Sequence, residues 1–216
     1  MHPTDEAARQ AQADAIAAYA TYSRYIATTN LTGLDLGGLV LSPGVYNFSS
    51  SAHLTGNLTL DYGADPAGSF LFLIGSTLTT ASDSSVTVLN GGASSGLFFN
   101  VGSSATLGTG TSFMGNILAM QSITMNTGAQ IKCGRAIALN AAVTLDTNKL
   151  SNNCYGDGAL ASGATDFGSN AFSGNVGQVS GAVPEPSIWA MMIFGFSLIG
   201  AMLRRRKSHG LTQQGT

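Results

Sequence analysis

One pentapeptide in the sequence could position a nucleophile for acyl transfer. Residues 92–96, GASSG, fit the G-x-S-x-G pattern, which exposes its serine when the segment forms a turn between a strand and a helix. Here it lies between short strand-like runs, and no helical pattern follows it. A histidine base is also missing, because His2 is terminal, His53 precedes the serine, and His209 lies beyond an apolar segment. The sequence therefore does not predict an enzyme.

Other chemical motifs are equally weak. Residues 156–161, GDGALA, imitate the first half of a dinucleotide-binding fingerprint, but no strand and helix pattern surrounds them. Histidine and cysteine residues do not cluster at the spacing of metal ligands. We therefore expect no cofactor and no metal site.

The two cysteines are candidates for a disulfide. Cys133 and Cys154 are 21 residues apart, about one turn of the repeat described below. This spacing could place their Cα atoms within the ~4.4–6.8 Å that a disulfide tolerates. Two unpaired thiols are the alternative.

Composition limits the classes of partner. Charged residues make up 9% of the 216 residues, and the net charge is −2, whereas a typical soluble domain has about 25% charged residues. No basic surface is available to hold a phosphate backbone, so nucleic-acid binding is excluded. With 44% hydrophobic residues, the chain is expected to fold. Its surface must be covered mainly by Ser, Thr, Asn and Gly.

A threonine repeat indicates how the chain is organised. Successive copies of the pattern Thr-[Leu/Met]-x-Thr are 18, 29, 18 and 20 residues apart, beginning at a degenerate Thr59 and continuing at Thr77, Thr106, Thr124 and Thr144. Such a period is typical of solenoids. One unit contains three short strand-like runs, for example 123–126, 129–132 and 136–139, separated by turn residues. Three strands per turn predict a triangular coil.

The first segment predicts the one long helix of the domain. Residues 5–27 carry apolar side chains, mostly alanines, at spacings of three and four, which is typical of an amphipathic helix. Its narrow face suits docking along a flat neighbour. The predicted fold is mainly β: a right-handed triangular parallel β-solenoid with this helix packed alongside, followed by a C-terminal transmembrane helix.

Stacked coils would give this fold a regular exterior. Equivalent residues would lie ~4.7–4.9 Å apart along the axis, and alternate outward residues of one strand roughly 6.5–7 Å apart. An array of hydroxyl and methyl groups without ions can order water at a spacing close to that of an ice plane. The alternative explanation of the threonine ladder is the β propensity of threonine.

Several stretches between Leu31 and Leu150 carry a family resemblance. They include LTGLDLGGLVLSPGVYNFSS, FLFLIGSTLTTASDSSV, VGSSATLGTGTSFMGNILA and SITMNTGAQI. This region resembles the microbial ice-binding protein family. The resemblance implies a discontinuous triangular β-solenoid with a long helix along one side, and binding of ice through one flat face.

The resemblance also implies candidate ice-binding residues. Family members often carry Thr-[Ala/Gly]-x-[Thr/Asn] on that face, and the matching stretches predict a site made of Thr80, Ser82, Asp83, Thr109, Thr111, Ser112, Thr127, Ala129, Gln130 and Thr147. The fourth position departs from the pattern, since Asp83, Ser112 and Gln130 stand where Thr or Asn is expected. The alternative face is the column Thr77, Thr106, Thr124 and Thr144.

The C-terminal segment predicts a membrane tail. Residues 187–203 form an uncharged stretch of 17 residues, at the short end of the range for a spanning helix. Basic residues follow it, so the positive-inside rule places the tail in the cytoplasm and the domain outside. The segment resembles the PEP-CTERM sorting signal of bacterial envelope proteins, and the residues that carry the resemblance are Pro184, Glu185, Pro186, Arg204, Arg205 and Arg206. The resemblance implies export, recognition by an exosortase-type enzyme, and delivery to the cell surface or extracellular matrix.

These observations predict the organisation of the chain. We expect an ice-binding solenoid domain at 1–155, a Gly/Ser-rich linker at 156–182, the sorting signal at 183–207 and a cytoplasmic tail at 208–216. Because neither a signal peptide nor a coil precedes the helix, we expect either that the chain is a fragment or that its true start lies upstream. The expected partners are the ice surface, the membrane and the sorting enzyme, and the domain is expected to be a monomer. A structural or adhesive envelope protein without ice activity is the alternative.

Overall fold

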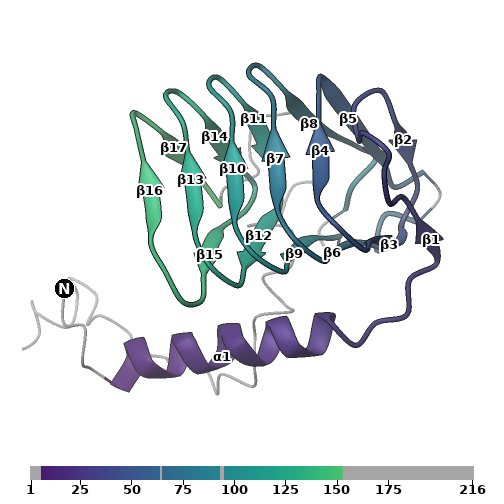
Figure 1. Cartoon of the computed structure of the whole chain (residues 1–216). Coiled ribbons are helices and arrows are strands. Elements are labelled where there is room, and N and C mark those ends of the chain that lie inside the picture. The colour runs from purple at the N-terminus through teal and green to yellow at the C-terminus, as the bar shows by residue number, and fades with distance from the viewer. Residues whose placement is uncertain (1–5, 64, 93–94, 153–216) are drawn as a thin grey trace, which may run out of the picture. The chain divides into compact units, whose positions relative to one another are not determined.

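The computed structural model describes residues 6–63, 65–92 and 95–152. All of them fall in the first of two compact units, Met1–Gly174. Within these ranges the chain forms one helix and many short strands, which join in three parallel sheets (Figure 1).

Each sheet contains every third strand of the chain. Sheet A consists of β1 (Thr29–Asn30), β3 (Gly44–Phe48), β6 (Ser69–Ile74), β9 (Gly96–Val101), β12 (Asn116–Ala119) and β15 (Ala136–Ala138). Sheet B consists of β4 (Ala52–Leu54), β7 (Leu78–Thr80), β10 (Ala105–Leu107), β13 (Ile123–Met125) and β16 (Val143–Leu145). Sheet C consists of β2 (Val40–Leu41), β5 (Asn57–Asp61), β8 (Ser85–Leu89), β11 (Ser112–Met114), β14 (Gln130–Lys132) and β17 (Lys149–Leu150).

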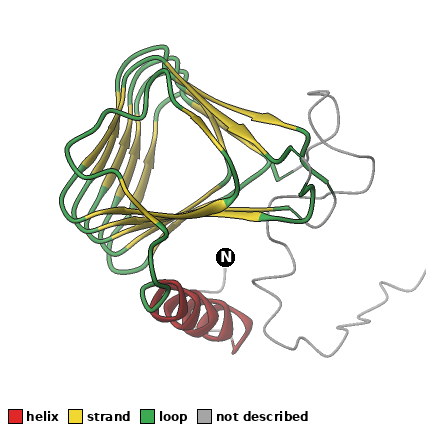
Figure 2. Cartoon of the chain, turned by 90° about the vertical axis from the view of Figure 1, so that its right-hand side faces the viewer, coloured by secondary structure: helices red, strands yellow, loops and turns green. Residues whose placement is uncertain are grey.

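The order of the strands makes a triangular coil. The chain passes from sheet A to sheet B to sheet C and then returns to sheet A one level further along, and the end view in Figure 2 shows the three sheets as the sides of a triangle. The three runs predicted within one repeat, 123–126, 129–132 and 136–139, are confirmed as β13, β14 and β15. The prediction of a mainly β fold with parallel sheets and one helix is therefore confirmed.

The interior of the coil is filled by stacked apolar side chains. Alternation along the short strands turns one side chain in two inward. Tyr46, Phe72 and Phe99 occupy equivalent positions on neighbouring strands of sheet A, with ring centroids 5.2 Å apart for the first pair and 4.5 Å for the second. Such offset ring pairs stabilise a core by roughly 0.5–1.5 kcal/mol beyond the area they bury.

Helix α1 (Glu6–Tyr22) lies along the outer face of sheet A (Figures 1 and 2). Ala15 and Tyr22 pack there in a cluster with outward residues of the sheet, Leu71, Phe98, Leu118 and Leu139. The helix was predicted to extend over 5–27, and its end at Tyr22 corrects that prediction. Ile26, which lies within the predicted range, is 88% exposed.

The early end of the helix has a local cause. The hydroxyl of Ser23 donates a hydrogen bond to the carbonyl of Tyr19 at 2.9 Å, and the amide of Arg24 bonds to Thr21 in a tighter turn. The amide of Tyr25 likewise bonds to Tyr22, three residues back, and these tighter turns end the α-helical bonding. The chain then turns toward β1.

Two predicted features lie wholly or partly outside the described residues. No helix within residues 6–63, 65–92 and 95–152 is long and apolar enough to cross a membrane, and the predicted span at 187–203 belongs to the other part of the chain, as do the linker and the sorting signal. Cys133 is buried and disulfide-bonded. Cys154, the other cysteine of the sequence, lies outside the described residues.

Candidate functional site

The outer face of sheet B carries a row of threonines in register. Thr79, Thr106, Thr124 and Thr144 pair with one another on consecutive strands, and His53 continues the row on β4. Most residues on either side of these threonines belong to the core or pack against it, as Leu78 and Ala105 do, whereas Leu145 beside Thr144 is 54% exposed. We call this line of side chains the central row.

A second row of hydroxyl groups runs beside the central row. Ser51, Thr77, Ser104 and Ser122 each lie two residues before a member of the central row, and alternation along the strand places them on the same face. The hydroxyl oxygens of Ser51 and Thr77 are 2.8 Å apart, and Ser122 donates to Ser104 at 3.0 Å. These bonds between coils fix the side chains of the second row.

The hydroxyls of the central row are available to solvent. Among the described residues, Thr79, Thr106, Thr124 and Thr144 make no side-chain hydrogen bond within the chain, although each is at least partly exposed. Each hydroxyl can therefore bond water, while the methyl group of the same side chain presents an apolar surface. The outer face of sheet B thus offers an array of hydroxyl and methyl groups.

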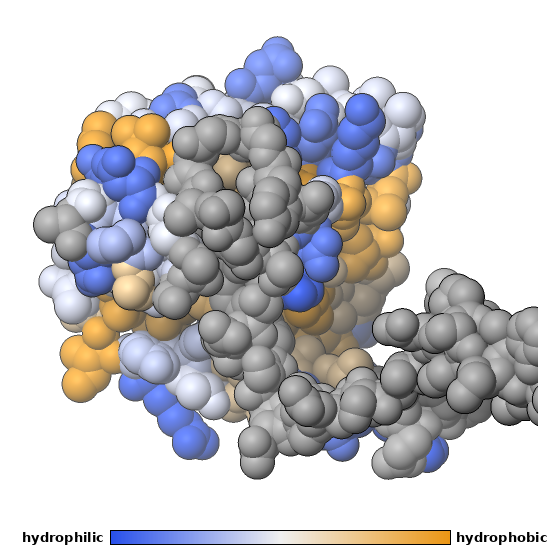
Figure 3. All heavy atoms as spheres, turned by 180° about the vertical axis from the view of Figure 1, so that it is seen from behind, coloured by the Kyte–Doolittle hydropathy of each residue, from blue (hydrophilic) through white to orange (hydrophobic). Residues whose placement is uncertain are grey.

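The other two faces of the triangle differ from this one. Lys132 and Lys149 occupy outward positions on sheet C, and the exposed Leu89 lies on the same side. Figure 3 views the molecule from the reverse side and shows strongly hydrophilic and hydrophobic residues intermingled there. Sheet A is covered by α1. Sheet B is therefore the one uncovered sheet whose outward side chains carry no lysine, arginine, aspartate or glutamate among the described strands.

Within the described part of the chain, the ionisable groups near sheet B lie at its edges. The backbone of Asp35 pairs with that of His53 in an isolated parallel β-bridge at the β4 end, and the Asp35 carboxylate accepts bonds from the amides of Gly37 and Thr55 at 2.7 and 2.8 Å. Partial burial raises the pKa of Asp35, but these bonds and the nearby His53 outweigh it and lower the pKa. At the opposite end, hydrogen bonds from Thr127 and Thr147 lower the pKa of Asp146.

The structure corrects part of the site predicted from the family pattern. Thr80, Thr111 and Ala129 are buried, with exposed fractions of 3% or less. The hydroxyl oxygens of Thr80 and Thr111 lie 2.8 Å apart inside the coil. These three residues belong to the core, because each stands at an inward position where the chain enters or leaves the corner between sheets B and C.

The remaining residues of that prediction do not share one face. Ser82, Asp83, Thr109, Thr127 and Thr147 are exposed at the corner between sheets B and C, whereas Ser112 and Gln130 are paired on sheet C. Asp83, Gly110, Gly128 and Thr147 occupy this corner with φ values of 57°, 71°, 72° and 57°. Glycine is favoured at such positive φ, so the Thr-Gly pair in this sequence marks a turn.

The alternative column predicted from the first threonine of each repeat agrees better with the structure than the site predicted from the family pattern. Thr106, Thr124 and Thr144 are in register on sheet B, but Thr79 rather than Thr77 continues their row. Thr77 lies in the second row. Thr79 was not predicted because an alignment of the first threonine of each repeat selects Thr77. The alternation Thr77-Leu78-Thr79 is the signal that both threonines face outward.

The segment that fits a hydrolase pattern has a structural role where it is described. The hydroxyl of Ser95 donates to the carbonyl of Pro66 at 2.7 Å and accepts from the amide of Gly92 at 2.7 Å. It thereby links two long corner loops between sheets C and A. Ser94 lies outside the described residues, and no group of three or more His, Cys, Asp or Glu side chains within the described part could hold a metal ion.

Comparison with known proteins identifies both parts of the chain. Residues 1–151 match the family described as "Ice-binding-like", and residues 182–207 match the PEP-CTERM protein-sorting motif. This motif indicates export to the cell envelope or extracellular space.

Individual relatives agree with the family match. An ice-binding protein from Nostoc sp. (strain HG1) is 51% identical over 94% of this chain and 68% of its own length. Ice-binding protein 1 of Shewanella frigidimarina is 36% identical over 56% of this chain, but the match spans only 14% of that longer protein. The crystal structure of an ice-binding protein from an Antarctic biological consortium has a TM-score of 0.63 and 37% identity, covering 68% of each chain. Since the family match spans most of the sequence and agrees with the fold, this chain belongs to the ice-binding-like family.

Proposed function

We propose that this protein binds ice through the outer face of sheet B. The observation that carries the proposal is the in-register central row, whose threonines Thr79, Thr106, Thr124 and Thr144 are flanked by a second hydroxyl row; the two rows contain no Asp, Glu, Lys or Arg. The names of the relatives described above support the choice of ice as the ligand.

The spacing of the two rows suits an ordered water lattice. Neighbouring strands set threonines ~4.7–4.9 Å apart along the coil axis, and the two rows are roughly 6.5–7 Å apart across it. Bonds such as Ser51 to Thr77 hold the second row in place before ice is met. Binding therefore costs little side-chain ordering, since preorganised groups lose little freedom on association.

The lack of Asp, Glu, Lys and Arg side chains on this face also favours contact with ordered water. A charged side chain orients its hydration shell around itself, and burying it against a solid without a partner is costly. On sheet C, Lys132 and Lys149 would interrupt an ordered water layer. On sheet B, the only ionisable member of the rows is His53, at one end.

The proposal extends to the organisation of the whole chain. The solenoid domain at 1–155 is right-handed, as nearly all parallel strand crossovers are, and acts as a monomeric, non-enzymatic ice-binding module. The segment 156–182 serves as a linker, 183–207 as the sorting signal with a transmembrane helix at 187–203, and 208–216 as a cytoplasmic tail. Support comes from the sorting motif at 182–207 and from the uncharged stretch within it.

Ice recrystallisation inhibition and crystal shaping test the proposal. The full chain, held in a zwitterionic detergent, is compared with detergent alone. We expect small, faceted crystals with the parent protein. Thr124→Tyr places a large ring in the centre of the central row and is expected to abolish the effect, because it holds the ice lattice off the neighbouring hydroxyls.

A matched variant on another face serves as the control. Thr87 is exposed on sheet C, so Thr87→Tyr adds the same ring without touching sheet B and should behave as the parent does. A parent protein that matches the detergent control would refute ice binding and favour the alternative of a structural or adhesive envelope protein. Equal loss in both variants would refute the assignment of the face.

A further inference from the structure

One position interrupts the central row of sheet B. His53 on β4 pairs with Thr79 of β7, and the pairing continues through the other threonines of the row. His53 therefore takes the place of a threonine on the first strand of the sheet. Its side chain is exposed, so the imidazole stands on the proposed ice-binding face.

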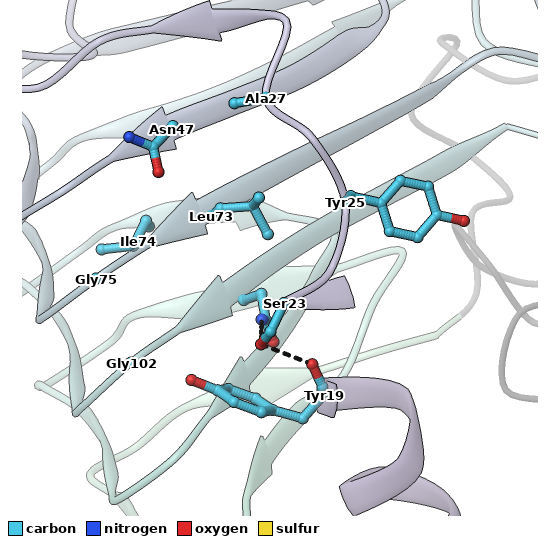
Figure 4. A pocket seen from close by; sticks show the side chains of 10 residues that line it. Tyr19, Ser23, Tyr25, Ala27, Asn47, Leu73, Ile74, Gly75 and Gly102 are labelled. Atoms are coloured by element: carbon cyan, nitrogen blue, oxygen red, sulfur yellow. Dashed lines mark hydrogen bonds between the residues drawn. The ribbon is translucent and has the colours of Figure 1, made fainter. Parts of the chain in front are cut away.

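Uniformity distinguishes the central row from a row on sheet A. Asn47, Leu73 and Asn100 are in register on β3, β6 and β9 and line the open groove beside the end of α1 (Figure 4). Amide and isobutyl groups alternate along this row, so no two neighbours present the same atoms. Such a row offers no repeating pattern to a crystal. The central row repeats one side chain on four successive strands, and its member on β4, His53, departs from the repeat.

The imidazole of His53 contributes little to the local fold. It makes no hydrogen bond to another described residue, and the backbone carbonyl of His53 accepts from the amide of Leu36 at 2.8 Å. The nearby carboxylate of Asp35 is already bonded by the amides of Gly37 and Thr55 and by the Thr55 hydroxyl. Threonine has a high β propensity, so a threonine at position 53 is expected to keep this strand.

The size of His53 matters to a flat ligand. Its ring carries the side chain further from the backbone than the methyl and hydroxyl groups of Thr79, which lies one strand spacing away, ~4.7–4.9 Å. A solid surface can meet Thr79 closely at this end only if the ring is pressed flat against the sheet. The ring then loses rotamer freedom and the water bound to its nitrogens. Otherwise the solid stays off the β4 coil.

The opposite end of sheet B is built differently. Asp146 follows Thr144 by two residues, but its carboxylate accepts bonds from the hydroxyls of Thr127 and Thr147 at the corner. These bonds hold the charge at the edge of the face and outside the central row. The row therefore ends on β16 with Thr144 itself, whereas on β4 it ends with an imidazole.

We propose that His53 sets the limit of the ice-binding face and keeps ice off the β4 coil. This inference rests on the proposed function, and it restricts the contact to the rows on β7, β10, β13 and β16. Four threonines span three strand spacings, about 14–15 Å along the coil axis, and a threonine at position 53 would lengthen the row to about 19–20 Å. His53 thereby determines how much of sheet B meets ice.

Two substitutions at position 53 test the proposal. The full chain in the zwitterionic detergent is compared with the parent in ice recrystallisation inhibition over a concentration series. We expect His53→Thr to reach the same inhibition at a roughly two- to tenfold lower concentration, as one added hydrogen-bonding group predicts. His53→Ser also replaces the ring by a small hydroxyl side chain and should gain as well. Loss of the fold would lower activity, so a gain reports on the face itself.

The same ring at other positions provides matched controls. Thr79→His moves the interruption one strand further into the row and should raise the required concentration by a similar factor, because one threonine is lost. Thr87→His places the ring at an exposed position of sheet C and should behave as the parent does. Thermal unfolding followed by circular dichroism shows whether each variant keeps its fold.

The outcomes separate this inference from the proposed function. Activity of His53→Thr and His53→Ser at or below that of the parent, with an unchanged Tm, would overturn the limit set by His53. A Thr79→His variant as active as the parent would overturn it as well. An inactive parent would refute ice binding and the inference together. A parent that is active, loses its activity in Thr124→Tyr and does not respond at position 53 would refute the inference alone.

Discussion

The buried threonine pair is the sharpest test of how the corner between sheets B and C is built. Thr80 and Thr111 match the family pattern for an ice-contacting surface, but the structure places both inside the coil. The oxygen of Thr80 also accepts a bond from the amide of Gly108 at 2.9 Å. Replacing Thr80 by Val keeps the shape of the side chain and removes only the hydroxyl.

The cost of Thr80→Val follows from these contacts. The substitution removes the bond to Thr111 and leaves the buried Gly108 amide without its acceptor, which together cost about 2–3 kcal/mol. For a domain of this size, each kcal/mol lowers Tm by about 2–4 °C, so we expect a decrease of about 4–12 °C. Thr111→Val loses the shared bond and a longer contact to the Ala81 carbonyl at 3.3 Å, and should cost about 1 kcal/mol.

A double-mutant cycle isolates the shared bond. The two single variants both remove the Thr80 to Thr111 hydrogen bond, so the sum of their costs should exceed the cost of the double variant by about 1 kcal/mol. Stability is measured by circular dichroism during thermal and urea unfolding with the disulfide intact. Ice recrystallisation is measured on the same samples below their melting temperature.

The two readouts separate a core role from a surface role. We expect Thr80→Val to lose stability and to keep its ice activity. Thr79→Tyr, one residue away on the outer face, should keep its stability and lose its ice activity. If Thr80→Val instead abolished ice activity with an unchanged Tm, the inward placement of Thr80 would be refuted, and the corner would have to be part of the ice-binding face.

Three further predictions concern stability. Asp35→Ala removes the acceptor of the Gly37 and Thr55 amides and should lower the free energy of urea unfolding by about 1–2 kcal/mol. Because the folded-state pKa of Asp35 is lowered, the stabilisation by its carboxylate is complete above the ordinary pKa of about 4 and is lost as the pH falls through the lowered pKa. The difference in stability between parent and variant should therefore shrink in acid, and a difference that grew in acid would contradict this reasoning. Tyr62→Phe removes the buried bond from the phenol to the Gly96 carbonyl at 2.8 Å and should cost about 1 kcal/mol, measured as a lower Tm; an unchanged Tm would argue against that bond. Reduction of the disulfide at Cys133 should lower stability by about 3 kcal/mol, and melting curves that coincide with and without reductant would count against it.

Much of the architecture was predictable because it depends on local patterns. Short apolar runs interrupted by glycine indicate short strands, and a repeat of about one coil length requires that they stack. The positions of β13, β14 and β15 follow from these rules. The helix was also predictable from its alanine spacing, although its end was not, because the apolar spacing continues to Ile26 while the backbone changes to tighter turns at Arg24 and Tyr25.

The candidate face was harder to predict because its register depends on contacts between coils. The first threonines of the repeats were aligned with one another, which linked Thr77 with Thr106. In the structure Thr106 pairs with Thr79, since the hydrogen bonds of the ladder and the packing of Leu78 in the core set the register. A two-residue shift in the pairing of neighbouring strands moves a threonine from one row to the other, and the sequence pattern is the same in both cases.

The sequence by itself determined the class of this protein: a chain poor in charge, with a threonine repeat of coil length, stacks into a parallel solenoid whose surface is neutral. The tertiary structure alone decided which hydroxyls face solvent, because a threonine at a corner and a threonine on a strand have the same chemistry and differ only in the backbone around them. Positive φ at Gly110 and Gly128 bends the chain, turns Thr111 and Ala129 into the core, and leaves the outer face of sheet B to Thr106 and Thr124.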